Sequence, residues 1–138
     1  MSLLNLAQTL AETYHKGQKY GIDDYYQYHI CGVVNSLKLH NLPESYLIVG
    51  YLHDIVEDTS ITIETIVNLF GETVGEAVDA ISKREGESRD NYLVRCSSNK
   101  IARIVKLQDA MFNSMNCFKN KNKTKHNEYL IAISKLTM

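Results

Sequence analysis

Apolar residues recur every three or four positions along most of this chain, which is the pattern of amphipathic helices packed around a shared core. In the first such segment the apolar stripe consists of Leu3, Leu6, Ala7, Leu10 and Tyr14. Similar patterns span about residues 26–40 and 99–116. The chain has one proline and few alternating, strand-like stretches. The pattern therefore predicts an all-α fold, a single compact helical bundle of about 7–8 helices.

Residues typical of helix ends mark the boundaries of these helices. Ser2, Thr62 and Asn99 precede apolar-periodic segments and are good N-caps. Pro43 stands near the start of a third helix, and Gly71 follows the segment that begins at Thr62. The remaining expectations are a helix opened by Thr73, a short helix near residues 88–96, a last helix carrying Tyr129, Ile133 and Leu136, loops over residues 17–24 and 83–87, and an exposed linker over residues 118–125.

The composition is that of one ordinary globular domain, and a single domain is expected over residues 1–138. The net charge of −1 shows no excess of basic residues, so no nucleic-acid partner is expected. No apolar run approaches the roughly 20 residues of a membrane span, and the N-terminus lacks a signal sequence, so a cytoplasmic location is expected. The three cysteines, Cys31, Cys96 and Cys117, are odd in number and are expected to be reduced thiols. These observations leave the oligomeric state open.

A cluster of acidic residues follows the apolar run at residues 46–52, where the third helix is expected to end. It contains His53, Asp54, Glu57 and Asp58. Carboxylates are disfavoured in the last turn of a helix, where the backbone dipole is already negative, so the cluster calls for a counter-charge. Imidazole and carboxylate together are ligands for a divalent cation. The plainer interpretation is a solvated acidic helix end followed by a loop.

Two distant residues strengthen the metal interpretation. His29 lies at the start of the second apolar helix pattern. Asp109 lies in the 99–116 pattern and shares a face with Ile101, Val105 and Phe112. A buried carboxylate without a partner is strongly destabilising, so Asp109 needs either a shared metal ion or a salt bridge to a Lys or Arg of another helix.

In chain order these residues read His, then His-Asp-x-x-Glu-Asp, then Lys-Leu-x-Asp-x-x-x-Asn, over residues 29, 53–58 and 106–113. The chain thereby resembles the HD superfamily of metal-dependent phosphohydrolases. Within it, the chain is most similar to the hydrolase domain of RelA/SpoT-type proteins and their small stand-alone relatives. Residues 83–88, with Tyr92 and Arg95 after them, also resemble small bacterial members.

This resemblance implies a helical HD-domain fold and assigns roles to individual residues. It implies one divalent ion, usually Mn²⁺ in the alarmone-hydrolase branch, held by His29, His53, Asp54 and Asp109. It implies catalytic roles for Glu57 and Asp58, which handle protons and the attacking water, and a substrate contact for Asn113. Further candidates for binding the phosphates are Lys19, Lys83, Arg84 and Lys106, the last of which has an alternative role as a helix-surface lysine.

The expected function is metal-dependent removal of the 3′-pyrophosphate of guanosine tetra- or pentaphosphate, with a small nucleotide as the binding partner. Two alternatives are an HD hydrolase of another nucleotide, such as a nucleoside monophosphate or a signalling nucleotide, and a non-catalytic HD module. The chain departs from the family at Ile30, where proline is frequent, and in the 17–24 loop, where Lys19 stands in place of a basic run. Weaker nucleotide affinity is therefore expected.

Other residues suggest chemistry less strongly. His15, His40 and His126 are potential extra metal ligands but are expected to be surface residues. Cys31 with His29 is a conceivable nucleophile pair, although no third group orients it. Tyr25, Tyr26 and Tyr28 suit either base stacking or core packing. The lysines of residues 119–123 are expected in a solvated loop.

Overall fold

The computed structural model describes residues 1–119 and 123–137, with side chains described for residues 1–116 and 125–137. The all-α prediction is confirmed. In chain order the elements are α1 (Leu3–Tyr14), β1 (Lys19–Tyr20), β2 (Asp23–Asp24), the π-helix η1 (Tyr25–Ile30), α2 (Cys31–Leu39), α3 (Glu44–Leu52), α4 (Ile55–Asp58), α5 (Ile63–Phe70), α6 (Glu72–Ile81), α7 (Arg89–Ser97), α8 (Lys100–Lys119) and α9 (Lys123–Thr137). None of the described helices is long and apolar enough to cross a membrane.

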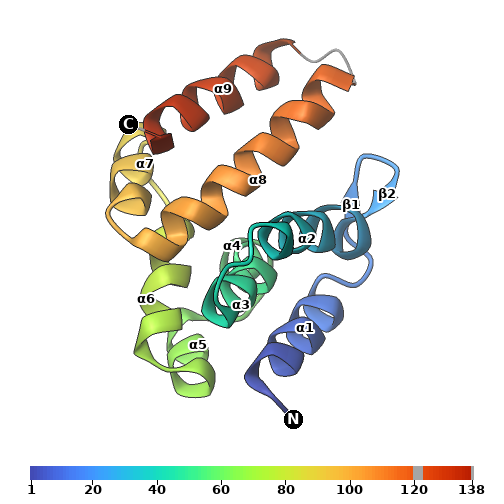
Figure 1. Cartoon of the computed structure of the whole chain (residues 1–138), viewed down its shortest axis with the longest axis vertical. Coiled ribbons are helices and arrows are strands. Elements are labelled where there is room, and N and C mark those ends of the chain that lie inside the picture. The colour runs from blue at the N-terminus through green and yellow to red at the C-terminus, as the bar shows by residue number, and fades with distance from the viewer. Residues whose placement is uncertain (120–122, 138) are drawn as a thin grey trace.

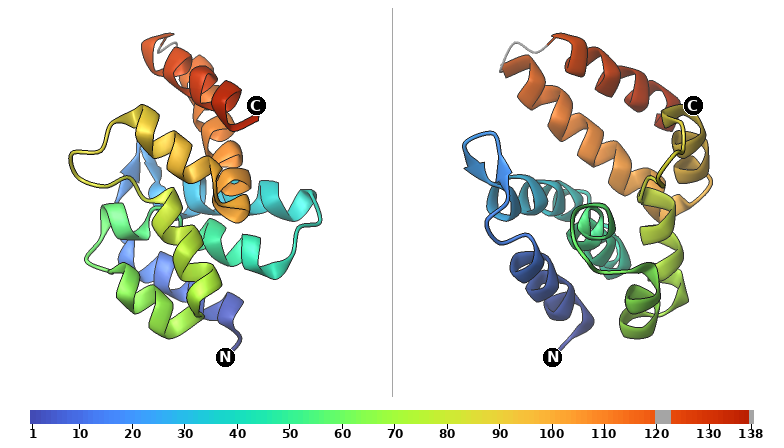
Figure 2. Two further views of the ribbon diagram at one scale, coloured as in Figure 1. Left: turned by 90° about the vertical axis from the view of Figure 1, so that its left-hand side faces the viewer. Right: turned by 180° about the vertical axis from the view of Figure 1, so that it is seen from behind.

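Helix α8 runs through the middle of the fold and contacts α2, α3, α6, α7 and α9 (Figure 1). Helix α9 returns antiparallel beside α8, while α1 lies on the other side of the molecule and packs against α3 (Figure 2). The core between these helices contains fully buried apolar side chains such as Leu37, Leu52, Ile55 and Leu93. Elements that are far apart in the sequence, η1, α3 and α8, are thereby brought together.

The predicted helix ends are confirmed where they depend on local capping. The side chains of Ser2, Thr62 and Asn99 accept hydrogen bonds from backbone N–H groups three residues later, at 3.1, 3.2 and 3.0 Å. Gly71 ends α5 with a φ of 93°, a left-handed conformation that favours glycine. These ends depend on interactions within one turn, which explains why the sequence predicts them.

The expectation that the acidic cluster forms the last turn of the third helix is wrong. Helix α3 ends at Leu52, and Glu57 and Asp58 lie in the separate short helix α4. The imidazole Nδ1 of His53 donates to the carbonyl of Gly50 at 2.6 Å, and an uninterrupted α-helix would use that carbonyl for the N–H of Asp54. The chain therefore turns at His53 and Asp54, which frees both side chains to face the same point.

Two other segments differ from expectation. The 17–24 loop contains a small antiparallel hairpin in which Lys19 pairs with Asp24 and Tyr20 with Asp23. The helix expected from about residue 26 begins instead as the π-helix η1 and becomes α-helical at Cys31. Such wide helical turns are frequent at functional sites.

Close packing of α2 on α8 sets the distance between two predicted metal ligands. A Cβ atom at Gly32 would lie 2.4 Å from Cε2 of Phe112, which real side chains do not tolerate. Glycine at this position lets α2 and α8 approach. His29, in η1 directly before α2, stands three residues before Gly32, and Asp109 stands three residues before Phe112 in α8. The packing therefore holds these two side chains against each other.

Candidate metal centre

The four predicted ligands converge on one point. Their donor atoms, Nε2 of both histidines and one carboxylate oxygen of each aspartate, all lie within 4.8 Å of one another. His29 Nε2 is 2.9 Å from Asp109 Oδ1 and 3.4 Å from Asp54 Oδ2. His53 Nε2 is 3.2 Å from Asp54 Oδ2 and 3.4 Å from Asp109 Oδ1. Each histidine thus faces both carboxylates, and the expected grouping of the four residues is present.

The hydrogen bonds of His53 reveal which ring nitrogen faces the cluster as an acceptor. Its Nδ1 lies 2.6 Å from the Gly50 carbonyl, which accepts only, so Nδ1 carries a proton. In the neutral ring the Nε2 lone pair then faces two carboxylates. This buried Nε2 has no hydrogen-bond partner. The arrangement requires a second proton on the ring or a cation between the groups.

Distances within the cluster fit a shared divalent ion. Metal–ligand bonds to imidazole and carboxylate are about 2.0–2.2 Å, which places adjacent ligands about 3.0–3.5 Å apart. The four contacts between imidazole and carboxylate span 2.9–3.4 Å. Hard oxygen and borderline nitrogen donors suit Mn²⁺ and other first-row ions. These four residues can therefore hold one such ion.

The second oxygen of Asp109 has a partner of its own. Lys106 Nζ lies 2.9 Å from Asp109 Oδ2, and Asn113 Nδ2 donates to Oδ1 at 3.2 Å. Lys106 exposes only 16% of its side chain, so its alternative role as a helix-surface lysine is wrong. The salt bridge considered for Asp109 exists, but its lysine comes from the same helix and accompanies the two histidines. Lysine and histidines together keep the buried carboxylate ionised.

The titration of the cluster follows from these contacts. Burial raises the pKa of Asp109, but Lys106 and the histidines outweigh it and hold the pKa well below its usual range. Burial likewise opposes ionisation of Asp54, yet His53 and His29 lower its pKa. Burial alone lowers the pKa of His53, whereas the adjacent carboxylates raise it well above its ordinary value. Both carboxylates are thus available as anionic ligands across the physiological range.

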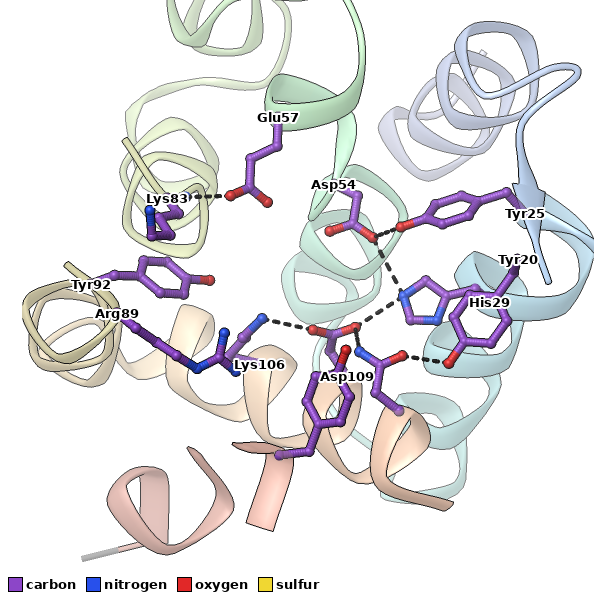
Figure 3. A pocket seen from close by; sticks show the side chains of 12 residues that line it. Tyr20, Tyr25, His29, Asp54, Glu57, Lys83, Arg89, Tyr92, Lys106 and Asp109 are labelled. Carbon is purple, nitrogen blue, oxygen red and sulfur yellow. Dashed lines mark hydrogen bonds and ion pairs between the residues drawn. The ribbon is translucent and has the colours of Figure 1, made fainter. Parts of the chain in front are cut away.

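A pocket of about 270 Å³ opens beside the four ligands (Figure 3). Its acidic side comprises the carboxylates of Asp54, Asp109 and Glu57. Its basic side comprises Lys83, Arg89 and Lys106. Its remaining lining residues are His29, Tyr20, Tyr25, Tyr92, Asn113 and Tyr129. A pocket that combines a cation-binding cluster with basic side chains is suited to a phosphorylated ligand.

The two predicted catalytic carboxylates occupy different positions. Glu57 lines the pocket, and its Oε1 accepts a hydrogen bond from the backbone N–H of Lys83 at 2.8 Å. Asp58 lies outside the pocket lining, toward His15 and Tyr25. Desolvation, and then the charge of Asp54, raise the pKa of both carboxyls above their ordinary values. A carboxyl with a raised pKa is a better proton acceptor near neutral pH than an ordinary one.

The predicted phosphate-binding residues separate into two groups. Lys83, Lys106 and Asn113 line the pocket. Arg84 does not; its guanidinium pairs with Asp79 at 3.1 Å, and 58% of its side chain is exposed. Lys19 lies exposed in β1, also away from the pocket lining. The geometry thus supports the first group and leaves the second without a contact to the site.

Several pocket residues were not predicted from the sequence. Arg89 is the first residue of α7, and Tyr129 lies on α9, where its spacing resembles that of a core residue. Tyr20 belongs to the hairpin; its ring stacks on His29 with centroids 5.0 Å apart, and its hydroxyl donates to Asn113 at 2.7 Å. Only the short helix expected near residues 88–96 placed Arg89 near a helix start, and no sequence signal placed these residues together.

The other histidines and cysteines also have definite environments. His15 is fully buried, so its expected surface position is wrong; its Nδ1 contacts Gln18 Oε1 at 2.7 Å. His40 is exposed, as expected. His126 is partly buried and contacts Ser114. Burial raises the pKa of the Cys31 thiol, which disfavours a nucleophilic role. The side chains of Cys117 and of residues 119–123 lie outside the described residues.

Comparison with known proteins identifies the family. The family model described as HD domain matches residues 7–111. The chain belongs to the HD-domain family. It is 32% identical over 123 residues to a GTP pyrophosphokinase rsh of Brucella melitensis and 29% identical over 122 residues to a probable GTP pyrophosphokinase of Mycobacterium leprae. Those alignments cover 81% and 82% of this chain but only 16% of each relative.

The fold of this HD domain is similar to that of a solved metazoan ortholog of SpoT, described as hydrolysing ppGpp and acting in starvation responses. The TM-score is 0.81, and the match covers 99% of this chain and 84% of the other, at 19% identity. The expected relationship to the RelA/SpoT branch is therefore confirmed at the level of family and fold.

Proposed function

We propose that this HD domain is a metal-dependent phosphohydrolase that removes the 3′-pyrophosphate of guanosine tetraphosphate. The observation that carries this proposal is the convergence of His29, His53, Asp54 and Asp109 beside a pocket that contains Glu57. The metazoan structure with the same fold is described as a ppGpp hydrolase, which supports the choice of substrate. Intact ligands together with a pocket-facing carboxylate favour catalysis over a purely binding role.

In this proposal the four clustered residues hold one divalent ion, with Mn²⁺ the first choice. When bound, such an ion polarises a phosphoryl oxygen and lowers the pKa of a water molecule. The protein itself supplies a fixed arrangement of ligands. Gly50 holds the ring of His53, and Lys106 and Asn113 hold the carboxylate of Asp109.

Glu57 is the proposed proton acceptor for the attacking water. Its carboxylate faces the pocket, and the Lys83 backbone N–H occupies Oε1, so Oε2 remains available for a water molecule. The raised pKa of Glu57 suits transfer of a proton near neutral pH. Asp58, on the outer side of the same turn, is proposed to assist through the charge that it contributes near Glu57.

Lys83, Arg89 and Lys106 are proposed to bind the phosphates, and Asn113 to contact the substrate. Three cations in the pocket lining offset part of the charge of a polyphosphate. Lys19 and Arg84, both predicted earlier in this role, would need to move to reach a ligand in the pocket. The second candidate function, an HD hydrolase acting on another nucleotide, rests on the 17–24 loop, where Lys19 is the one basic residue and lies outside the pocket lining.

The test is a panel of nucleotides incubated with the purified chain and Mn²⁺, with products identified chromatographically. The proposal predicts release of pyrophosphate and GDP from guanosine tetraphosphate, and loss of this activity in Asp109→Asn. Orthophosphate released from a nucleoside monophosphate, with no action on guanosine tetraphosphate, would support the second candidate. Nucleotide binding without turnover of any compound would indicate a non-catalytic module.

A further inference from the structure

The hydroxyl of Tyr25 contacts the metal-ligand cluster directly. It donates a hydrogen bond to Asp54 Oδ2 at 2.5 Å, and that oxygen also faces His29 (Figure 3). The same oxygen lies 3.2 Å from Nε2 of His53. Tyr25 opens η1, the same π-helix that carries His29 four residues later. The helix η1 therefore supplies one predicted ligand, His29, and also a hydrogen bond to a second predicted ligand, Asp54, at the turn between α3 and α4.

The ring of Tyr25 is held in place on several sides. Its centroid lies 5.3 Å from the ring of buried His15 and 5.2 Å from that of His29. Its backbone N–H donates to the Gln18 carbonyl at 3.0 Å. The Gln18 side chain bonds His15 and also donates from Nε2 to the Asp58 carbonyl at 3.0 Å.

These contacts join three segments around one carboxylate. Residues 15–18 bind to Tyr25 on one side and to the end of α4 on the other. Asp54, at the turn between α3 and α4, has no side-chain cap contact that would otherwise fix its orientation. Among the described hydrogen bonds to the Asp54 carboxylate, the Tyr25 hydroxyl is the donor from outside the ligand set.

We propose that Tyr25 is a positioning residue for the metal centre, which fixes the Asp54 carboxylate so that Oδ2 faces the ion shared with the two histidines. A hydrogen bond to a ligating carboxylate orients it before the ion binds, and loss of such an outer contact typically lowers metal affinity about 10–100-fold. The inference rests on the metal centre of the proposed function but not on the identity of the substrate.

The experiment compares Tyr25→Phe with Tyr28→Phe in the full chain. Tyr28 lies in the same π-helix, and its hydroxyl also makes one side-chain hydrogen bond, to Asn116 Oδ1 at 2.7 Å, away from the ligands. Each chelator-stripped protein is titrated with Mn²⁺ by calorimetry or by electron paramagnetic resonance of the free ion. We expect Tyr25→Phe to raise the Kd for Mn²⁺ by about 10–100-fold and Tyr28→Phe to change it less than about 3-fold.

A second measurement separates positioning from general loss of structure. If Tyr25 acts through Asp54, hydrolysis by Tyr25→Phe should need more Mn²⁺ for half-maximal rate and should recover at saturating Mn²⁺. An unchanged Kd, or equal weakening in both variants, would overturn the inference. Absence of Mn²⁺ binding by the unmodified chain would overturn both the metal centre and this inference. Normal Mn²⁺ binding without hydrolysis of any nucleotide would refute the proposed function alone and leave the affinity comparison decisive for Tyr25.

Discussion

Replacement of Glu57 by glutamine removes one proton-accepting group while preserving its contacts. Glu57 Oε1 accepts the Lys83 backbone N–H at 2.8 Å, and the amide oxygen of glutamine accepts the same bond. The side chain keeps its size, and the four clustered ligands are untouched because Glu57 is not among them. The expected result is therefore a folded, metal-binding protein with little turnover.

The size of the effect follows from the role assigned to this carboxylate. General acid–base groups contribute about 10²–10⁴-fold to rate, which is about 3–5 kcal/mol in activation free energy. Burial, and next the charge of Asp54, raise the pKa of Glu57. A base must be deprotonated, so the turnover of the unmodified enzyme should fall as the pH drops through this raised pKa. Glu57→Gln should lack that acidic limb.

Glu57→Gln should lower the activity of the protein without lowering its folding stability. The pKa of Glu57 is higher in the folded chain than in the unfolded chain, so folding favours the protonated carboxyl. Ionisation of Glu57 therefore lowers the free energy of unfolding as the pH rises from the ordinary glutamate pKa through the raised one. Glutamine removes this unfavourable charge. Near neutral pH the variant should be at least as stable as the unmodified protein in the metal-free state.

The assay measures kcat against pH at saturating Mn²⁺, bound metal after desalting, and thermal unfolding. Glu64→Gln is the matched control, since Glu64 is an exposed glutamate in the first turn of α5. Loss of bound metal in Glu57→Gln would make Glu57 a ligand and refute the division of roles. Retention of full activity, with the acidic limb intact, would assign the base to another residue, with Asp58 the next to test.

Asp109 and the His53–Asp54 pair were predictable as candidate ligands because each stands in a local pattern with an unusual charge, whereas His29 gained its assigned role from the resemblance to the HD superfamily. A carboxylate on an apolar helix face, as at Asp109, needs a partner wherever the helix packs, and the His53–Asp54 pair follows a buried segment. The helix caps were predictable for a similar reason, since each depends on hydrogen bonds within a single turn. In both cases the signal that marks the residue lies within a few positions of the chain, although the ligands themselves meet only after folding.

The features that the sequence did not reveal depend on packing between distant segments. The break after Leu52 depends on an imidazole that takes a helix carbonyl, and the periodicity of apolar residues does not report this. His15 reads as a surface residue at the end of α1, yet it is fully buried, with Gln18 and Tyr25 in contact with its ring. Arg89 and Tyr129 reach the pocket only because α7 and α9 both pack on α8.

Two further predictions concern the charge of the cluster. Lys106→Met removes the ammonium group 2.9 Å from Asp109 Oδ2 and leaves a buried carboxylate short of a partner. The free energy of unfolding of the metal-free protein, measured in urea, should therefore fall by up to about 3–5 kcal/mol. The control Lys100→Met, at the exposed start of α8, should have little effect. The last prediction concerns the same cluster: the four ligands converge only in the folded chain, so an ion that they bind stabilises the fold. Mn²⁺ at 100 times its Kd should therefore stabilise the fold by about 2.7 kcal/mol and raise the melting temperature by about 10 °C. Asp109→Asn should lose this shift and Asp23→Asn, an exposed substitution in β2, should keep it. An equal shift in Asp109→Asn would place the Mn²⁺ site elsewhere on the chain.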